Sequence, residues 1–247
     1  MNRRLFCALN QRKMSIKEIL QEYGALLNEV ERWFASCAAI DPSGISCGSG
    51  CAECCRGLFD ITLLDACYLK CGFDRIEEEK KKAVLKKARQ RIKGLQALWP
   101  DFSPPYVLNY RPEEEWEILM PDDEETPCPL LDDYGRCMVY DHRPMTCRLH
   151  GLPLIDVSGE VMHDEWCTLN FRENSLLELP DLRWDFRKLF TDELVVFRRF
   201  TFELFGQSLN ELDTFVPASL LLDFDDFKWR EWFERSRLFN YNPSPFH

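Results

Sequence analysis

Cysteine is the residue type in this chain whose number and spacing point most clearly to chemistry. The sequence contains 12 cysteines in 247 residues. Four of them fall within the short segment Cys47-Gly-Ser-Gly-Cys51-Ala-Glu-Cys54-Cys55. Intervals of two and three residues let one loop turn several sulfurs toward a single point, and a thiolate binds zinc at about 2.3 Å, with a similar reach to iron. Gly48 and Gly50 supply the backbone freedom that such a loop needs.

A second group of cysteines lies farther along the chain and is more widely spaced. Ligands from distant parts of a sequence are typical of a metal site that ties a fold together. Sulfur ligands with few histidines suit both zinc and iron–sulfur clusters, and the spacing alone does not decide between them. Eight thiols could form two tetrahedral zinc sites, or four could hold one [4Fe-4S] cluster while the others hold zinc. The predicted metal ligands are Cys47, Cys51, Cys54, Cys55, Cys128, Cys137, Cys147 and Cys167.

Two motifs in this region resemble a known family. The segment Cys128-Pro-Leu-Leu-Asp-Asp-x-Gly-x-Cys137-x-x-Tyr140-x-x-Arg143-Pro144-x-x-Cys147-Arg148 follows a Cys-x3-Cys-x2-Cys-Cys cluster. This order is similar to the YkgJ-type cysteine-cluster family, also called CxxCxxCC or zinc- or iron-chelating domain proteins. The resemblance covers about residues 45–150, and Cys167 lies beyond it. Seven of the eight predicted ligands, all except Cys167, fall on cysteines of the motif.

The resemblance implies a thiolate metal site, with an activity that is undefined for most family members. Some larger relatives are associated with lysine N-methylation of flagellin and carry an iron–sulfur cluster. An iron–sulfur cluster, such as [4Fe-4S], is therefore slightly favoured over zinc as the cofactor. This preference comes from the relatives and not from any count of cysteines.

Two other interpretations of the cysteines are open at this point. In an oxidising compartment eight thiols could form four disulfides, but the first residues, MNRRLFCALNQRK, carry no export signal, and adjacent cysteines suit disulfide geometry poorly. The spacing Cys47-x3-Cys51-x2-Cys54 also occurs in radical S-adenosylmethionine enzymes. That family usually has an aromatic residue where this chain has Glu53, and it needs a βα alternation that the pattern here lacks.

Several side chains near the cysteines have predicted roles of their own. His150 and His163 could be imidazole ligands, although a solvent-facing or hydrogen-bonded ring is the simpler interpretation. Arg143 and Arg148 are expected to neutralise a polythiolate cluster or to pair with the acidic stretch before it. Tyr140 is expected to pack under the loop.

The remaining cysteines are expected to have other roles. Cys37 continues an apolar helical stripe and is predicted to be a small buried hydrophobe. Cys67 and Cys71 share one helical face, where half-buried packing is favoured over a thiol clamp. Cys7 lies on the N-terminal arm and has no assigned role.

Hydrophobic periodicity and capping signals predict the helices that position these residues. Ser15-Ile-Lys-Glu18 is a capping box that begins the first helix, and Gly72, Pro100 and Gly206 are expected to end later ones. Another capping box is predicted at Ser208–Glu211, with Pro217 as a stop. Seven prolines predict irregular chain over residues 100–135. Helices are predicted from residue 15 to the break at Asp41-Pro42-Ser43-Gly44, and over residues 62–71, 74–99, 182–204 and 223–239.

The predicted fold is mainly α, with helices packed around an irregular, metal-organised, cysteine-rich middle segment. The length suits one domain. We expect a single domain over residues 1–247, with a cysteine-cluster metal-binding region at 45–170. An aromatic-rich helical region at 180–247 holds 12 of the 18 phenylalanines and is expected to be core.

The overall composition excludes several classes of function. A net charge of −11 argues against binding to nucleic acid or anionic lipid, and no apolar run approaches the roughly 18 to 20 residues of a membrane span. We therefore expect a cytoplasmic protein with no nucleic acid or membrane as partner. No phosphate-binding or hydrolytic motif is present in the sequence.

Two functions are compatible with these observations. The first is a metal-binding protein with a redox, metal-handling or partner-binding role, whose partners are the metal ion or cluster and a protein. The alternative is an enzyme, lysine N-methylase-like or a redox catalyst, that uses the cysteine cluster next to a substrate cleft. A pocket beside Cys147 and Cys167 would favour the enzyme, whereas complete thiolate coordination without a cleft would favour the binding module.

Overall fold

The computed structural model describes residues 15–40, 44–47, 50–112, 115, 126–163, 166–170 and 180–236. Helices dominate these residues, so the prediction of a mainly α fold is confirmed. The elements are α1 (Ile16–Ile40), β1 (Asp60–Thr62), α2 (Leu63–Phe73), α3 (Glu78–Leu98), η1 (Tyr140–His142), α5 (Met145–Leu149), β2 (Leu154–Ile155), β3 (Val161–His163), η3 (Pro180–Leu182), α6 (Phe186–Phe205), β4 (Asp213–Phe215), α7 (Val216–Ser219) and α8 (Trp229–Arg235).

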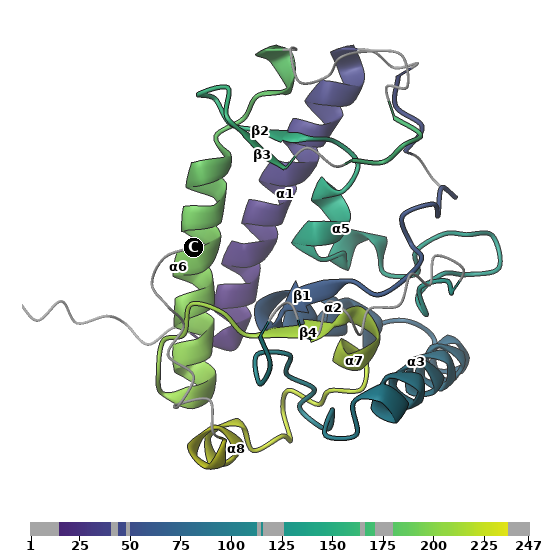
Figure 1. The fold of residues 1–247 in the computed structure, drawn as a ribbon, viewed down its shortest axis with the longest axis vertical. Helices are drawn as coiled ribbons and strands as arrows, with labels where there is room; N and C mark the ends of the chain where they lie inside the picture. The colour runs from purple at the N-terminus through teal and green to yellow at the C-terminus, as the bar shows by residue number, and fades with distance from the viewer. Residues whose placement is uncertain are drawn as a thin grey trace, which may run out of the picture.

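The long helices α1 and α6 lie side by side and form the main axis of the fold (Figure 1). The predicted capping box begins α1: the Ser15 N–H donates to Glu18 Oε2 at 2.8 Å, and the Glu18 N–H donates to Ser15 Oγ at 3.3 Å. Helix α6 ends at Gly206, whose φ of 79° is the left-handed conformation expected for a glycine C-cap. Local sequence signals therefore set the start of α1 and the end of α6.

Aromatic side chains join α1 to the start of α6. The Trp33 ring stacks on Trp184 with centroids 5.9 Å apart and meets Phe186 edge-on at 5.0 Å. The Trp33 Nε1–H also donates to the carbonyl of Leu182 at 3.0 Å. Phe186 and Phe200 are completely buried. Most aromatic residues of α6 are thus core residues, as the sequence predicts, whereas Phe202 is 51% exposed.

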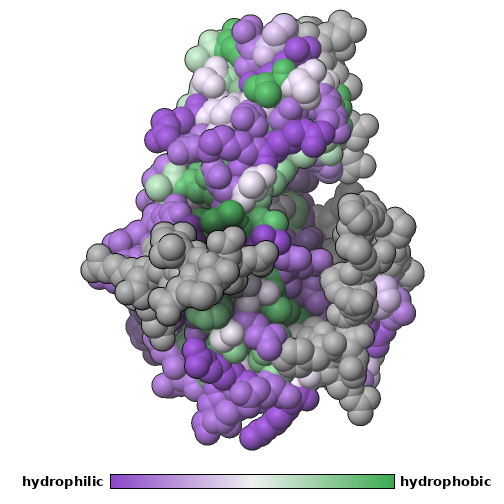
Figure 2. Space-filling model, turned by 90° about the vertical axis from the view of Figure 1, so that its left-hand side faces the viewer, coloured by the Kyte–Doolittle hydropathy of each residue, from purple (hydrophilic) through white to green (hydrophobic). Residues whose placement is uncertain are grey.

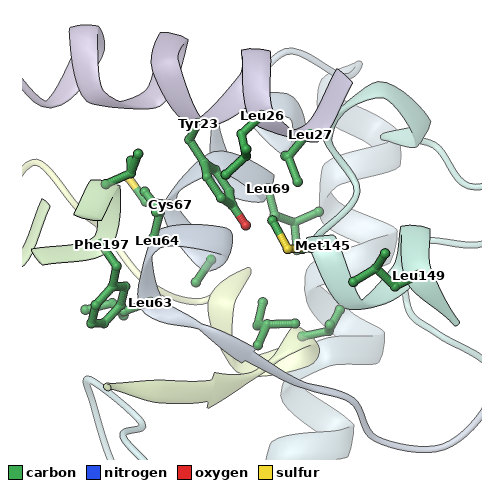
Figure 3. Packing of buried hydrophobic residues seen from close by; sticks show 14 of the residues in the cluster. Tyr23, Leu26, Leu27, Leu63, Leu64, Cys67, Leu69, Met145, Leu149 and Phe197 are labelled. Carbon is green, nitrogen blue, oxygen red and sulfur yellow. The ribbon is translucent and has the colours of Figure 1, made fainter. Parts of the chain in front are cut away.

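Helices α2 and α5 pack against the inner face of α1. Figure 3 shows Tyr23 from α1, Leu69 from α2 and Met145 from α5 pointing toward one another. All three are buried. This packing matters for the candidate site, because α5 carries Cys147 and its position depends on the helices behind it.

Two small sheets complete the described fold. Strand β1 pairs antiparallel with β4, with Thr62 opposite Asp213, and β2 pairs antiparallel with β3. The predicted helix at Ser208–Glu211 is wrong, because the chain there leads into β4. Pro217 does not stop a helix but lies in the first turn of α7, where its missing N–H would have no helical partner.

The prediction that Gly72 ends the second helix is also wrong. It lies inside α2, which continues to Phe73 and is capped by Asp74. A Cβ on Gly72 would lie 2.5 Å from the Cβ of His142, so the glycine allows η1 to approach α2 closely. The glycine serves packing and not helix termination.

The other helices fit the predictions in part. Helix α3 ends at Leu98, before Pro100, and α8 is shorter than the predicted residues 223–239, of which 237–239 lie outside the described part. Hydrophilic residues make up most of the coloured surface in Figure 2, with smaller hydrophobic patches between them. Among the described residues, no helix is both long and apolar enough to cross a bilayer.

Candidate metal centre

All eight predicted cysteines line one cavity with a volume of about 800 Å³. They reach it from four parts of the chain: the loop around residues 47–55, the hairpin at 128–137, helix α5, and the turn at 166–170. The structure therefore brings all eight predicted cysteine ligands together. Their role as metal ligands remains a prediction.

Backbone pairing holds the first two cysteine segments together. The Cys128 N–H donates to the Cys55 carbonyl at 2.7 Å, and the Gly57 N–H donates to the Thr126 carbonyl at 3.1 Å. These bonds make a short antiparallel bridge between chain segments more than 70 residues apart. The bridge sets Cys55 directly beside Cys128.

Two glycines allow the same segments to touch a second time. Gly50 has a φ of 89° and Gly135 a φ of 73°, both in the left-handed region that favours glycine. A Cβ on Gly135 would lie 3.1 Å from the Gly50 carbonyl oxygen. The predicted backbone role of Gly50 is confirmed, while Gly48 lies outside the described residues.

Asp132 shapes the hairpin that carries Cys128 and Cys137. Its Oδ1 accepts the N–H groups of Tyr134 at 2.9 Å and Arg136 at 2.8 Å. These backbone hydrogen bonds lower the pKa of the half-buried Asp132 carboxyl. In the sequence Asp132 stands out only as part of the family motif, although an Asp three residues before a glycine is a recognised turn signal.

Asn170, which the sequence does not single out, joins the segments that carry Cys47 and Cys167. The side chain is 1% exposed, its Nδ2 donates to the Gly151 carbonyl at 2.7 Å and to Cys47 Sγ at 3.2 Å, and its Oδ1 accepts the Ser46 N–H at 2.9 Å. Asn170 follows Cys167 by three residues, so one buried amide links the two cysteine-bearing segments. No sequence motif indicates this role, because the partners Ser46 and Cys47 lie more than 120 residues away in the sequence.

Asp65 anchors the start of α5 and was also missed. Its Oδ1 accepts the Met145 N–H at 2.9 Å and the Tyr23 hydroxyl at 2.7 Å. Burial raises the pKa of the Asp65 carboxyl to about 6. The carboxyl thereby ties α5, and with it Cys147, to α1 and α2.

The two motif arginines share one carboxylate at the edge of the cavity. Arg143 Nη2 lies 2.8 Å from Glu31 Oε1, and Arg148 forms an ion pair with the same oxygen. Arg148 is 6% exposed and also donates to the Asp141 carbonyl at 2.9 Å. Both arginines line the cavity, so their positive charge faces the thiols.

Tyr140 does not pack under the loop as predicted. It is 50% exposed, and the Arg143 guanidinium lies 3.6 Å from the centre of its ring. The aromatic side chain therefore supports the arginine from outside, through a cation–π contact. That prediction is wrong because the sequence does not reveal which face of η1 is covered.

Burial favours the protonated form of several thiols around the cavity. Burial raises the pKa of Cys147 well above its usual value, and the neighbouring Cys128, Cys137 and Cys54 raise it further. Burial also raises the pKa of Cys128, to about 12. The pKa of Cys54 rises mainly through a hydrogen bond with Cys55, and burial adds to the effect. A metal that binds here must displace protons.

A second set of thiols forms around Cys47. Burial raises the pKa of Cys47, while its hydrogen bond with Asn170 lowers it, and Cys167 and Cys51 raise it again by repulsion between thiolates. Cys54 also raises the pKa of both Cys47 and Cys147, so it lies between the thiols around Cys47 and those around Cys147. The eight cysteines therefore divide into neighbouring groups within one cavity.

The donor atoms suit zinc or iron, but they are not drawn together around one point. Within the described residues, no three His, Cys, Asp or Glu side chains are already arranged to hold a single metal ion. Protonated thiols gain nothing from close approach, because only the thiolate is a strong ligand. The chemistry of the donor set thus fits a metal, and binding requires the sulfurs to deprotonate and move inward.

The other candidate residues are clearly placed. His150 lines the cavity and packs edge-on against Phe59, with ring centroids 5.5 Å apart, whereas His163 is exposed on β3, as its simpler interpretation predicts. Cys37 is completely buried in the core, so that prediction is confirmed. Cys7 lies outside the described residues.

Residues 46–168 match the model of a family described as CxxCxxCC, "Putative zinc- or iron-chelating domain". The matched range contains all eight candidate cysteines, including Cys167, and ends just before Asn170. No curated protein and no solved structure matches the chain. The match supports binding of zinc or iron in the region where the cysteines share a cavity. The chain belongs to the CxxCxxCC family of zinc- or iron-chelating domain proteins.

Proposed function

We propose that the protein binds an iron–sulfur cluster through cysteine thiolates in the shared cavity, with zinc as the alternative occupant. The observation that carries this proposal is that eight cysteines from four chain segments line the same space. The primary ligand set is proposed to be the group whose thiols influence one another most directly. It consists of Cys54, Cys128, Cys137 and Cys147.

We favour a cluster over a single zinc ion at the primary set because, in the described residues, no three donors are already arranged around one ion. Four sulfurs around zinc must lie about 3.8 Å apart, as follows from bonds of about 2.3 Å at tetrahedral angles. In a [4Fe-4S] cluster each cysteine binds a different iron atom, so the cysteine sulfurs stay farther apart than around one zinc ion. No three donors in the described residues are within reach of one ion, and a wider centre therefore needs less rearrangement.

The second set is the proposed place for zinc or for additional support of the cluster. It consists of Cys47, Cys51 and Cys167, with Cys55 adjacent to the primary set. Asn170 supports this assignment, because its N–H donates to the sulfur of Cys47 at 3.2 Å and such a bond stabilises a thiolate. Arg143 and Arg148 would offset part of the negative charge of the bound thiolates.

The size of the cavity favours a second candidate function, an enzyme. A volume of about 800 Å³ lies within the roughly 300–1,000 Å³ typical of small-molecule sites and exceeds what metal ligands need. Phe34, Phe59 and Met138 add apolar surface to its wall. A redox or methyl-transfer catalyst with a substrate beside the centre is therefore the alternative to a redox, metal-handling or partner-binding module.

We also propose that residues 1–247 act as one domain in the cytoplasm. Buried residues from α1 through α8 belong to one hydrophobic cluster, which supports the first part. The second part rests on the need of the proposed centre for reduced thiols.

Metal analysis of protein purified without air tests the proposed function. We expect stoichiometric iron, with a broad absorption near about 400 nm that bleaches on reduction. Zinc without this absorption would establish the alternative occupant. Fully folded protein that contains neither metal would overturn the proposal.

A matched pair of cysteine variants tests the ligand assignment. Cys54→Ser should lower the metal content and the melting temperature together, because a ligand is lost. Cys37→Ser removes a completely buried cysteine outside the cavity and should change only packing. Equal metal retention in both variants would contradict the assignment of Cys54.

A further inference from the structure

A second cavity, of about 860 Å³, lies between α1, α2, η1 and residues 223–225. None of the eight cysteines of the candidate metal centre lines it, and Arg75 is the one residue that the two cavities share. Its wall contains Cys67 and Cys71 instead. These two thiols therefore form a separate cluster of metal-ligating side chains.

Cys67 and Cys71 lie one turn apart on the same face of α2, and a hydrogen bond links their thiols. Cys67 is 4% exposed, whereas Cys71 is partly exposed to the cavity. Residues four apart on a helix have Cβ atoms about 5–6 Å apart, but a disulfide needs roughly 3.5–4.5 Å. The helix thus holds the two sulfurs close without letting them bond to each other.

We propose that Cys67 and Cys71 form a two-sulfur binding site for a thiophilic monovalent ion of the cuprous type. A linear sulfur–metal–sulfur unit spans about 4–5 Å, because each bond is about 2.3 Å or slightly less. That span fits two thiols on successive helical turns. The site needs no disulfide and no change of the helix.

The surroundings of the pair argue against zinc. Zinc prefers four ligands, and no third His, Cys, Asp or Glu side chain in the described residues completes a site with these two sulfurs. His142 is the nearest imidazole on this wall, but its Nε2 lies 3.3 Å from Arg75 Nη1 and its ring stacks on Tyr68. A soft ion satisfied by two thiolates is the class that remains.

The charges around the pair prepare one of the two thiols for binding. The pKa of Cys71 is lowered to about 7, mainly by the hydrogen bond from Cys67 and also by Arg75, while burial, Asp74 and Asp225 act in the opposite sense. Near neutral pH, Cys71 can therefore bind as a thiolate. The Cys67 thiol then loses one proton to solvent as its sulfur binds, which leaves a complex of charge −1.

Anaerobic titration of the full-length, metal-loaded protein with Cu(I), against a chromophoric Cu(I) chelator, tests the proposal. At saturation, Cys71→Ser should bind one Cu(I) fewer than the unaltered protein, and Cys67→Ala should do the same. Cys37→Ser is the matched control and should bind as many as the unaltered protein. Cys71 is partly exposed, so its serine variant should keep the native circular dichroism.

Residue-specific labelling separates this site from the candidate metal centre. Peptide mapping after maleimide treatment should show that Cu(I) protects Cys71. Zinc and iron contents should be the same in Cys71→Ser as in the unaltered protein, whichever metal occupies the first cavity. Undiminished Cu(I) binding by Cys71→Ser, or Cys71 labelling that Cu(I) does not change, would overturn the two-sulfur site without affecting the proposed centre.

Discussion

Asp65 connects the hydrophobic core to the candidate metal centre, and its replacement tests that connection. In Asp65→Ala the Tyr23 hydroxyl and the Met145 N–H lose their shared acceptor, which lies 2.7 Å from one donor and 2.9 Å from the other. The Met145 N–H is left buried without this acceptor, whereas the Tyr23 hydroxyl keeps a longer hydrogen bond to Glu193 Oε1 at 3.4 Å. A buried donor left without a partner costs about 1–3 kcal/mol, so we expect a loss of about 1–3 kcal/mol in unfolding free energy. Because the Met145 N–H begins α5, Cys147 should lose its position and metal should dissociate faster.

Asp65→Asn separates the hydrogen bonds from the charge. The asparagine Oδ1 can still accept both hydrogen bonds, but it carries no buried charge. Burial raises the pKa of Asp65 from 3.8 to about 6, so between these values the folded protein binds more protons than the unfolded chain. The stability contributed by Asp65 is therefore present below pH 3.8 and is lost as the pH rises to about 6. The loss is about 1.4 kcal/mol per pH unit and about 3 kcal/mol in total.

Urea unfolding from pH 4 to pH 8 measures both effects. The stability of the unaltered protein relative to Asp65→Asn should fall between pH 4 and pH 6 and stay constant above that range. Asp74→Asn is the control, since this carboxylate lies at the end of the same helix in an exposed pair with Lys70 and should change stability by less than about 1 kcal/mol. Equal stability of Asp65→Ala and the unaltered protein, or identical pH profiles for Asp65→Asn and the unaltered protein, would refute the reasoning.

Two further predictions concern the cysteine loops. Gly135→Ala should destabilise the protein by about 1–3 kcal/mol and shorten metal retention during a chelator challenge, because the φ of 73° and the contact with Gly50 are both unfavourable for a side chain. The control is Gly94→Ala on the exposed side of α3, which should stabilise the protein by up to about 1 kcal/mol. Equal effects of the two substitutions would count against the loop contact. Metal affinity should rise as the pH increases from 6 to 8, because burial raises the pKa values of Cys128 and Cys147 and these thiols must lose protons to bind metal. Each binding event should therefore release protons, which an indicator dye measures. Binding without proton release would mean that the thiols are already ionised.

Local signals predicted the elements well where one stretch of chain contains the whole cause. The capping box at Ser15 and the left-handed glycine at Gly206 depend on residues within a few positions of each other. The box at Ser208–Glu211 has the same local form but fails, because β4 instead pairs with β1, a strand about 150 residues earlier. A local signal can be overruled when a distant segment offers better backbone hydrogen bonds.

Sequence alone determined the donor chemistry of this protein: the number of thiols, their spacing, and their resemblance to a zinc- or iron-chelating family. These properties belong to the covalent chain and survive any arrangement of it. Tertiary structure decided which thiols share a cavity, that Asp65 and Asn170 hold their segments, and that Cys67 and Cys71 stand apart. The physical reason is that hydrogen bonds between residues 80 to 120 positions apart leave no periodic trace in the sequence, so only the folded chain reveals them.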